Sequence, residues 1–112
     1  MEKKIEELAG EFQNMQRQLV AILGQKQQIM AQEEEVKLAK EELKTAKGKV
    51  FRAIGGILIE SSIADAANSL ENQGEALKLR GQMLAKQEER VTKRMTEIRE
   101  IVQKQTSAAG EQ

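Results

Sequence analysis

Side chains that could carry out catalysis or hold a metal are scarce in this chain. It has no histidine and no cysteine, so the commonest general base and metal ligand is missing, and so is the thiolate. Carboxylates and lysines remain, but they are spread over segments where no deep pocket is expected. The pair Gly55-Gly56 belongs to neither a GxGxxG nor a GxxxxGK[ST] phosphate loop. We therefore predict a binding protein without catalytic residues, cofactor or metal, and not an enzyme.

The charge balance argues against nucleic acid and membrane as partners. The chain has 18 basic and 18 acidic residues, and the first helical segment mixes Glu and Lys instead of presenting a basic face. The longest apolar run, Ala53 to Ile59, is far too short to span a bilayer. The first residues alternate in charge and lack the apolar region of a signal peptide. We expect a soluble, cytoplasmic protein with a single domain over residues 1–112.

The elements that would position any binding surface are mainly helical. Ala, Glu, Lys, Leu and Arg make up about half of the chain, and proline is absent. Apolar residues spaced three and four apart predict helices over residues 2–47 and 62–106, followed by a tail at 107–112. The first seam contains Ile5, Leu8, Phe12, Met15, Leu19, Ile22, Ile29, Val36 and Leu43. The second contains Ala67, Leu70, Leu77, Leu84, Val91, Met95, Ile98 and Val102.

A short apolar stretch between the two helices predicts a β-hairpin over residues 49–61. Gly55-Gly56 is typical of a two-residue turn, which would place Ile54 opposite Ile57. A shift of the pairing by one residue stays open. After the hairpin, Ser62 and Asp65 have the spacing of a capping box, which marks the start of the second helix.

Because a hairpin reverses the chain, the two helices should pack antiparallel as a coiled coil. The register that best matches large residues with small ones pairs positions whose numbers sum to about 110. It places Gly81 opposite Ile29 and Gly74 opposite Val36, and we expect these glycines to let the helices approach closely.

Three charged residues interrupt the first seam, namely Lys26, Glu33 and Lys40. They could fix the register and disfavour a parallel dimer. They could equally be solvated residues whose stems cover the leucines opposite while their charged groups reach water, which is the interpretation that we favour.

The hairpin predicts an oligomer. An isolated two-stranded hairpin is marginal in water, and two helices cannot cover both of its faces and both of its edges. Hairpins from several chains could pair edge to edge and close into a barrel. Alternatively, the hairpin could pack back onto its own helices and leave a monomer or dimer. The residues expected in the oligomer interface are Val50, Phe51, Ala53, Ile54, Gly55, Gly56, Ile57, Leu58 and Ile59.

The order helix, single hairpin, helix resembles the beta-type subunits of the prefoldin family. The hairpin sequence from Lys49 to Glu60 is similar to the family's basic-aromatic-basic strand, apolar residue, glycine and apolar strand. The glutamine-rich stretches 16–19 and 25–28 and the stretch 84–90 also resemble it. The similarity covers about residues 5–104, although no single motif in it is strict.

This resemblance implies a function and a set of partners. It implies a hetero-hexamer of two alpha-type and four beta-type subunits, built on a platform of hairpins with coiled-coil arms. It implies an ATP-independent chaperone that holds non-native proteins at the tips of the arms and delivers them to a group II chaperonin. The compact chain looks more archaeal than eukaryotic.

In that geometry, the start of the first helix and the end of the second form the free tip. We hypothesise that this pair frays and exposes apolar side chains to client proteins, although they could also be core residues that stay paired. Ile5, Ile101 and Val102 lie nearest the end and are the better candidates. The full set is Ile5, Leu8, Phe12, Met15, Met95, Ile98, Ile101 and Val102. The alternative function is a structural coiled-coil adaptor that binds one specific partner helix.

Overall fold

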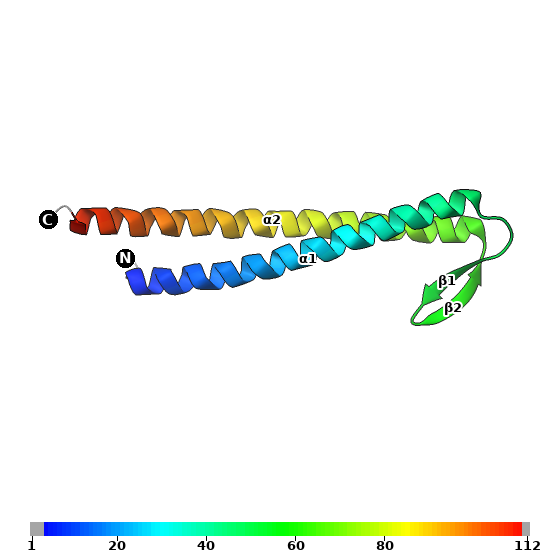
Figure 1. The fold of residues 1–112 in the computed structure, drawn as a ribbon, viewed down its shortest axis with the longest axis horizontal. Helices are drawn as coiled ribbons and strands as arrows, with labels where there is room; N and C mark the ends of the chain where they lie inside the picture. Colours follow the sequence, from blue (N-terminus) through cyan, green and yellow to red (C-terminus); the bar gives the residue numbers. More distant parts are fainter. Residues whose placement is uncertain (1–3, 111–112) are drawn as a thin grey trace. The chain divides into compact units, whose positions relative to one another are not determined.

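The computed structural model describes residues 4–110, which form two long helices with two strands between them (Figure 1). Helix α1 spans Ile5–Thr45, strand β1 spans Val50–Ile54, strand β2 spans Ile57–Ser61 and helix α2 spans Ile63–Gly110. This order confirms the predicted helix, hairpin, helix arrangement.

Helix α1 ends two residues before the predicted boundary at residue 47. Its last turn tightens, since the Ala46 N–H donates to the Leu43 carbonyl oxygen at 3.3 Å. Gly48 then adopts a φ of +84°, a left-handed conformation that glycine reaches without steric cost. The predicted start at residue 2 lies outside the described residues.

Helix α2 starts where the capping box predicted. The Asp65 N–H donates to the Ser62 hydroxyl oxygen at 3.0 Å, which satisfies one of the free N–H groups of the first turn. At its other end the helix continues to Gly110, so residues 107–110 are helical instead of belonging to the predicted tail. Two alanines in this stretch favour helix. The last two residues of the predicted tail lie outside the described part of the chain.

The hairpin has the predicted register. Ile54 pairs with Ile57 and Ala53 pairs with Leu58, so the alternative register is not adopted. Gly55 and Gly56 form the two-residue turn with φ values of +57° and +81°. Positive φ at both central residues is the type I′ geometry, whose twist matches that of the flanking strands.

The described residues fall into two compact units. The first comprises the described parts of Met1–Lys26 and Met83–Gln112. In it, Glu11 contacts Arg94 and Lys26 contacts Glu88, so the two helical segments run antiparallel. The buried side chains of this unit are all predicted seam residues: Leu8, Ile22, Leu84, Val91 and Ile98.

The second unit is Gln27–Gln82, which contains the end of α1, the hairpin and the start of α2. Its two glycine positions confirm the predicted register. A Cβ atom on Gly81 would lie 3.8 Å from Ile29 Cγ2, and one on Gly74 would lie 3.8 Å from Val36 Cγ1. Both distances are ordinary van der Waals contacts. The glycines thus face the predicted residues, and an alanine would also fit at either position, so this contact does not require glycine.

One seam position of the second unit differs from the expectation. Ala66 is buried, whereas the predicted Ala67 is exposed. Residues spaced three and four apart share a helix face, so positions 66 and 67 are both compatible with Leu70 on the seam. The packing at the start of α2 decides between them.

Within residues 4–110, neither helix contains a stretch that is both long and apolar enough to cross a membrane.

Candidate functional site

The predicted tip residues lie together in the first unit but differ widely in exposure. Leu8 and Ile98 are only 2% exposed and form the best-packed part of the seam. Ile5 is 45% exposed and Ile101 is 37% exposed. The others are half-buried: Phe12, Met15, Met95 and Val102.

A mostly apolar groove runs along one side of this packed pair. Phe12, Ile98 and Val102 of the predicted tip line it together with Ala9. Its remaining lining side chains are polar and come from both helices: Gln13, Gln16, Arg99 and Gln103. Met15 is separated from this groove and lines another depression with Ile22, Val91 and Arg94. The structure thus brings only part of the predicted set into one surface.

Arg99 and the three glutamines were not predicted as site residues. The guanidinium carbon of Arg99 lies 6.0 Å from the centroid of the Phe12 ring, at the outer limit of a cation–π contact. The glutamines are exposed, and each amide offers both a donor and an acceptor. All four flank the seam at helix positions that the apolar pattern leaves unassigned, so periodicity alone could not single them out.

A charged cluster links the two helices of this unit beside the depression that Met15 and Arg94 line. Arg94 donates from Nε to Glu11 Oε1 at 2.5 Å and from Nη2 to Glu11 Oε2 at 3.1 Å, a two-point contact. It also donates to Glu97 Oε2 at 3.3 Å. The hydrogen bonds to Glu11 and then to Glu97 raise the pKa of the Arg94 guanidinium above its ordinary value. Arg94 therefore stays charged throughout the neutral range and joins the helices near Leu8 and Ile98.

The charged seam residues behave differently from one another. Lys26 Nζ donates to both carboxylate oxygens of Glu88, at 2.9 and 3.2 Å, and both side chains are partly buried. Lys40 Nζ donates to Glu71 at 2.9 Å in an exposed pair. Glu33 is exposed. The lysine ammonium groups are thus paired across the helices, whereas we expected them to reach water singly.

The second candidate surface is the hairpin, whose apolar side chains are largely uncovered. Phe51 is 59% exposed and Leu58 is 71% exposed on one face. Ile54, Ile57 and Ile59 are also exposed on the other face. Of the predicted interface residues, Val50 is half-buried and Ala53 is exposed. The structure places the whole predicted set on this two-stranded sheet, and its two outer edges have no strand beside them within the described residues.

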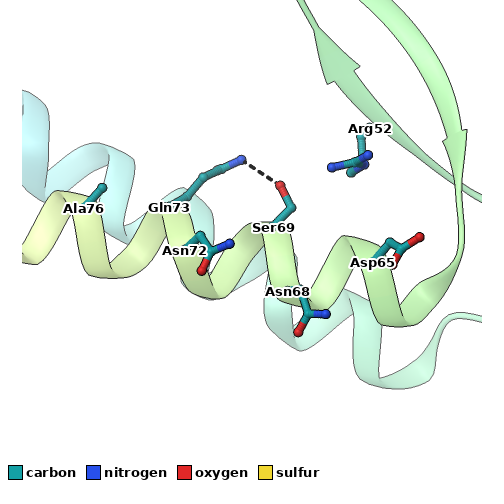
Figure 2. Close-up of a pocket in the computed structure, with 7 residues that line it drawn as sticks. All are labelled: Arg52, Asp65, Asn68, Ser69, Asn72, Gln73 and Ala76. Atoms are coloured by element: carbon teal, nitrogen blue, oxygen red, sulfur yellow. Dashed lines mark hydrogen bonds between the residues drawn. The ribbon is translucent and has the colours of Figure 1, made fainter.

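One charged residue interrupts this apolar surface. Arg52 on β1 is half-buried and lies above the first turns of α2, in a polar concavity that Figure 2 shows. In the sequence it belongs to the stretch from Lys49 to Glu60 that carries the family resemblance, and it was not predicted as a site residue. Its position over α2 depends on how the hairpin folds back, which the strand pattern does not encode.

Within the described residues, neither surface contains a cluster of side chains that could bind a metal ion. Among the described residues, no three acidic or other ligating side chains come close enough together to hold an ion. Both surfaces are suited to binding other macromolecules through apolar contact.

Comparison with known proteins gives consistent results. The family model described as prefoldin subunit matches residues 6–109. The fold is similar to the crystal structure of the prefoldin beta subunit from Thermococcus strain KS-1, with a TM-score of 0.80 and 22% sequence identity. That similarity covers 89% of this chain and 90% of the Thermococcus chain. No curated protein matches the sequence.

Proposed function

The chain belongs to the prefoldin subunit family, and from that premise we propose that it is a beta-type subunit of an ATP-independent holding chaperone. The observation that carries the proposal is the apolar groove of the first unit, which Phe12, Ile98 and Val102 line, together with the exposed Ile5 and Ile101 of the same unit. A non-native protein exposes apolar side chains that a native protein buries, and such a groove would cover them.

Client binding at this surface does not require the whole pair of helices to separate. Ile5 and Ile101 are exposed, and Val102 lines the groove, so these three residues would contact a client directly. Leu8 is fully packed and would contact a client only if the last turns opened, whereas Ile98, although only 2% exposed, lines the groove. The ion pairs between Arg94 and Glu11 hold the helices together near these two residues and would confine fraying to the ends of the unit.

The hairpin supports the proposed assembly. Its exposed isoleucines, Phe51 and Leu58 would be covered if hairpins from several subunits joined edge to edge. We propose two alpha-type and four beta-type subunits in the complex, with delivery of clients to a group II chaperonin in the cytoplasm. The likeness in fold to the prefoldin beta subunit from Thermococcus strain KS-1 supports the assignment to the beta type.

The test is suppression of client aggregation by the assembled oligomer. A variant with Ile5→Ser, Ile101→Ser and Val102→Ser should keep the oligomer mass and lose most of its ability to keep a chemically denatured client in solution. The matched control is Val20→Ser, Leu38→Ser and Leu79→Ser, which removes three apolar side chains that are exposed outside the groove.

Two results would count against the proposal. Equal suppression by both triple variants would show that clients bind elsewhere on the arms. A purified chain that does not bind an alpha-type prefoldin subunit would favour the alternative function, a coiled-coil adaptor for one specific helix.

A further inference from the structure

Arg52 is the only charged side chain on its face of the hairpin. It projects from β1 toward α2, where the concavity in Figure 2 separates the hairpin from the helix. The concavity is lined on the α2 side by Asp65, Asn68, Ser69, Asn72, Gln73 and Ala76.

The guanidinium group of Arg52 is only partly accommodated by this concavity. Its Nε atom is buried and has no hydrogen-bond partner among residues 4–110. Asp65 lines the same concavity but forms no ion pair with Arg52 within 4 Å in the described chain. Gln73 donates to the Ser69 hydroxyl oxygen at 3.4 Å, so these two side chains are engaged with each other. A buried N–H donor without an acceptor is unfavourable, and an acceptor from another chain could satisfy the Nε atom of Arg52.

The hairpin itself cannot supply that acceptor. The register places Ile59 directly opposite Arg52, and the pairs Val50–Ser61 and Ile54–Ile57 flank it on the same face. None of these side chains carries a carboxylate. The hairpin's only acid, Glu60, is opposite Phe51 on the other face, where it pairs with Lys49 at 3.6 Å.

A second copy of the chain would not supply a carboxylate to Arg52 either. Side chains on neighbouring strands that share a face lie side by side. A copy joined edge to edge, with its helices on the same side, would place only apolar residues, Ser61 or another Arg52 next to this guanidinium. Self-pairing would therefore leave Arg52 unsatisfied or beside a like charge.

We propose that Arg52 selects the partner subunit: it disfavours pairing with a second copy and receives an acidic side chain from the hairpin of a different prefoldin subunit. A carboxylate can accept two parallel N–H groups from a guanidinium, which makes the contact both strong and directional. The inference rests on the proposed assembly through hairpins and adds the residue that decides between partners.

The experiment compares Arg52→Leu with Lys49→Leu, which removes the neighbouring exposed lysine charge and serves as the matched control. Light scattering gives the mass of each chain alone, and titration with an alpha-type prefoldin subunit gives the dissociation constant. Arg52→Leu should self-associate at concentrations where the parent chain does not. It should also bind the alpha-type subunit at least about tenfold more weakly, because the partner's carboxylate is left unpaired. Lys49→Leu should match the parent chain in both measurements.

Arg52→Gln guards against an effect of folding alone, since it keeps a polar side chain at this position and should change both measurements in the same direction. In a second arm, Arg52→Glu is combined with alpha-type subunits whose hairpin acids are changed to lysine one at a time. Restored binding in one combination identifies the acidic partner, and restoration in none overturns the proposal.

The two hypotheses fail in different ways. A parent chain that binds no prefoldin subunit would remove the proposed function. A parent chain that assembles normally, with Arg52→Leu equal to Lys49→Leu in either measurement, would overturn the role of Arg52 and leave the proposed function standing.

Discussion

At the scale of single residues, the charged side chains next to the seam hold the two helices together in pairs. Lys26 contacts Glu88 and Arg94 contacts Glu11, and all four side chains are partly shielded from water. Partial shielding makes such pairs more effective than fully exposed ones, which contribute little. The charged seam positions therefore have a role in pairing the helices, beyond simple tolerance of solvent.

Replacing Arg94 by methionine should lower the melting temperature by a few degrees, because the hydrogen bonds from Arg94 to Glu11 and Glu97 are lost while the apolar stem is kept. Thermal unfolding followed by circular dichroism measures the change. The raised pKa of Arg94 makes its contribution fully present below the ordinary arginine value and lost only above it. The difference between the parent and the variant should therefore stay constant between about pH 6 and about pH 9.

Lys93→Met is the control for Arg94, since Lys93 is an exposed neighbour on the same helix. It should leave the melting temperature nearly unchanged. The difference in melting temperature between the two variants should also shrink in about 1 M salt. At that concentration the electrostatic screening length is only a few ångströms. A salt-independent difference would assign the effect to packing of the stem.

At the scale of the elements, the glycines of α2 pair with large residues of α1 without forcing the helices together. Gly81 faces Ile29 and Gly74 faces Val36, as the register required. Each position nevertheless has room for one more methyl group. The helix therefore carries the conformational cost of glycine without a steric need for it.

Gly81→Ala should raise the free energy of unfolding by about 0.5–1 kcal/mol, the difference in helix propensity between the two residues. Urea denaturation of the purified chain measures the effect. Gly24→Ala is the matched control, because nothing lies within 4 Å of the added methyl group there and only helix propensity changes. A gain at Gly24 combined with a loss at Gly81 would show that the helices approach more closely at Ile29 than the structure has them.

At the scale of the whole molecule, the short hairpin carries five of the large apolar side chains that stay exposed among the described residues. Phe51 and Leu58 are more than half exposed on a sheet of only two strands. A two-stranded sheet of this kind is marginal by itself, so its stability depends on what covers it. The proposed assembly would supply that cover.

Phe51→Ser with Leu58→Ser should therefore weaken assembly with an alpha-type prefoldin subunit. Burial of each side chain is worth roughly 1.5–3 kcal/mol, so the dissociation constant should rise at least about tenfold. Sedimentation velocity of the mixture measures the assembly. Leu38→Ser with Leu79→Ser is the control, because these leucines are equally exposed on the helices and should leave assembly unchanged. Equal weakening by both pairs would place the interface on the helices.

The sequence alone determined the order of the elements, the two-residue turn at Gly55-Gly56, the capping residue Ser62 and the two glycine layers. Each follows from a local rule: a spacing of three and four residues for the helices, two adjacent glycines for a type I′ turn, and a short hydroxyl side chain before the first helical turn. Local rules act over a few residues, so they can be applied before any long-range contact is known. The family resemblance extended the same pattern to the function.

The tertiary structure alone decided which of these residues are exposed at the surface. It separated the buried Leu8 and Ile98 from the exposed Ile5 and Ile101, although all four lie on or next to the same apolar pattern. It joined Glu11 to Arg94, which are 83 positions apart in the chain, and it left the Arg52 Nε atom over α2 without an acceptor among residues 4–110. Long charged side chains can reach several partners, so periodicity fixes their helix face and only the packed structure decides which group they contact.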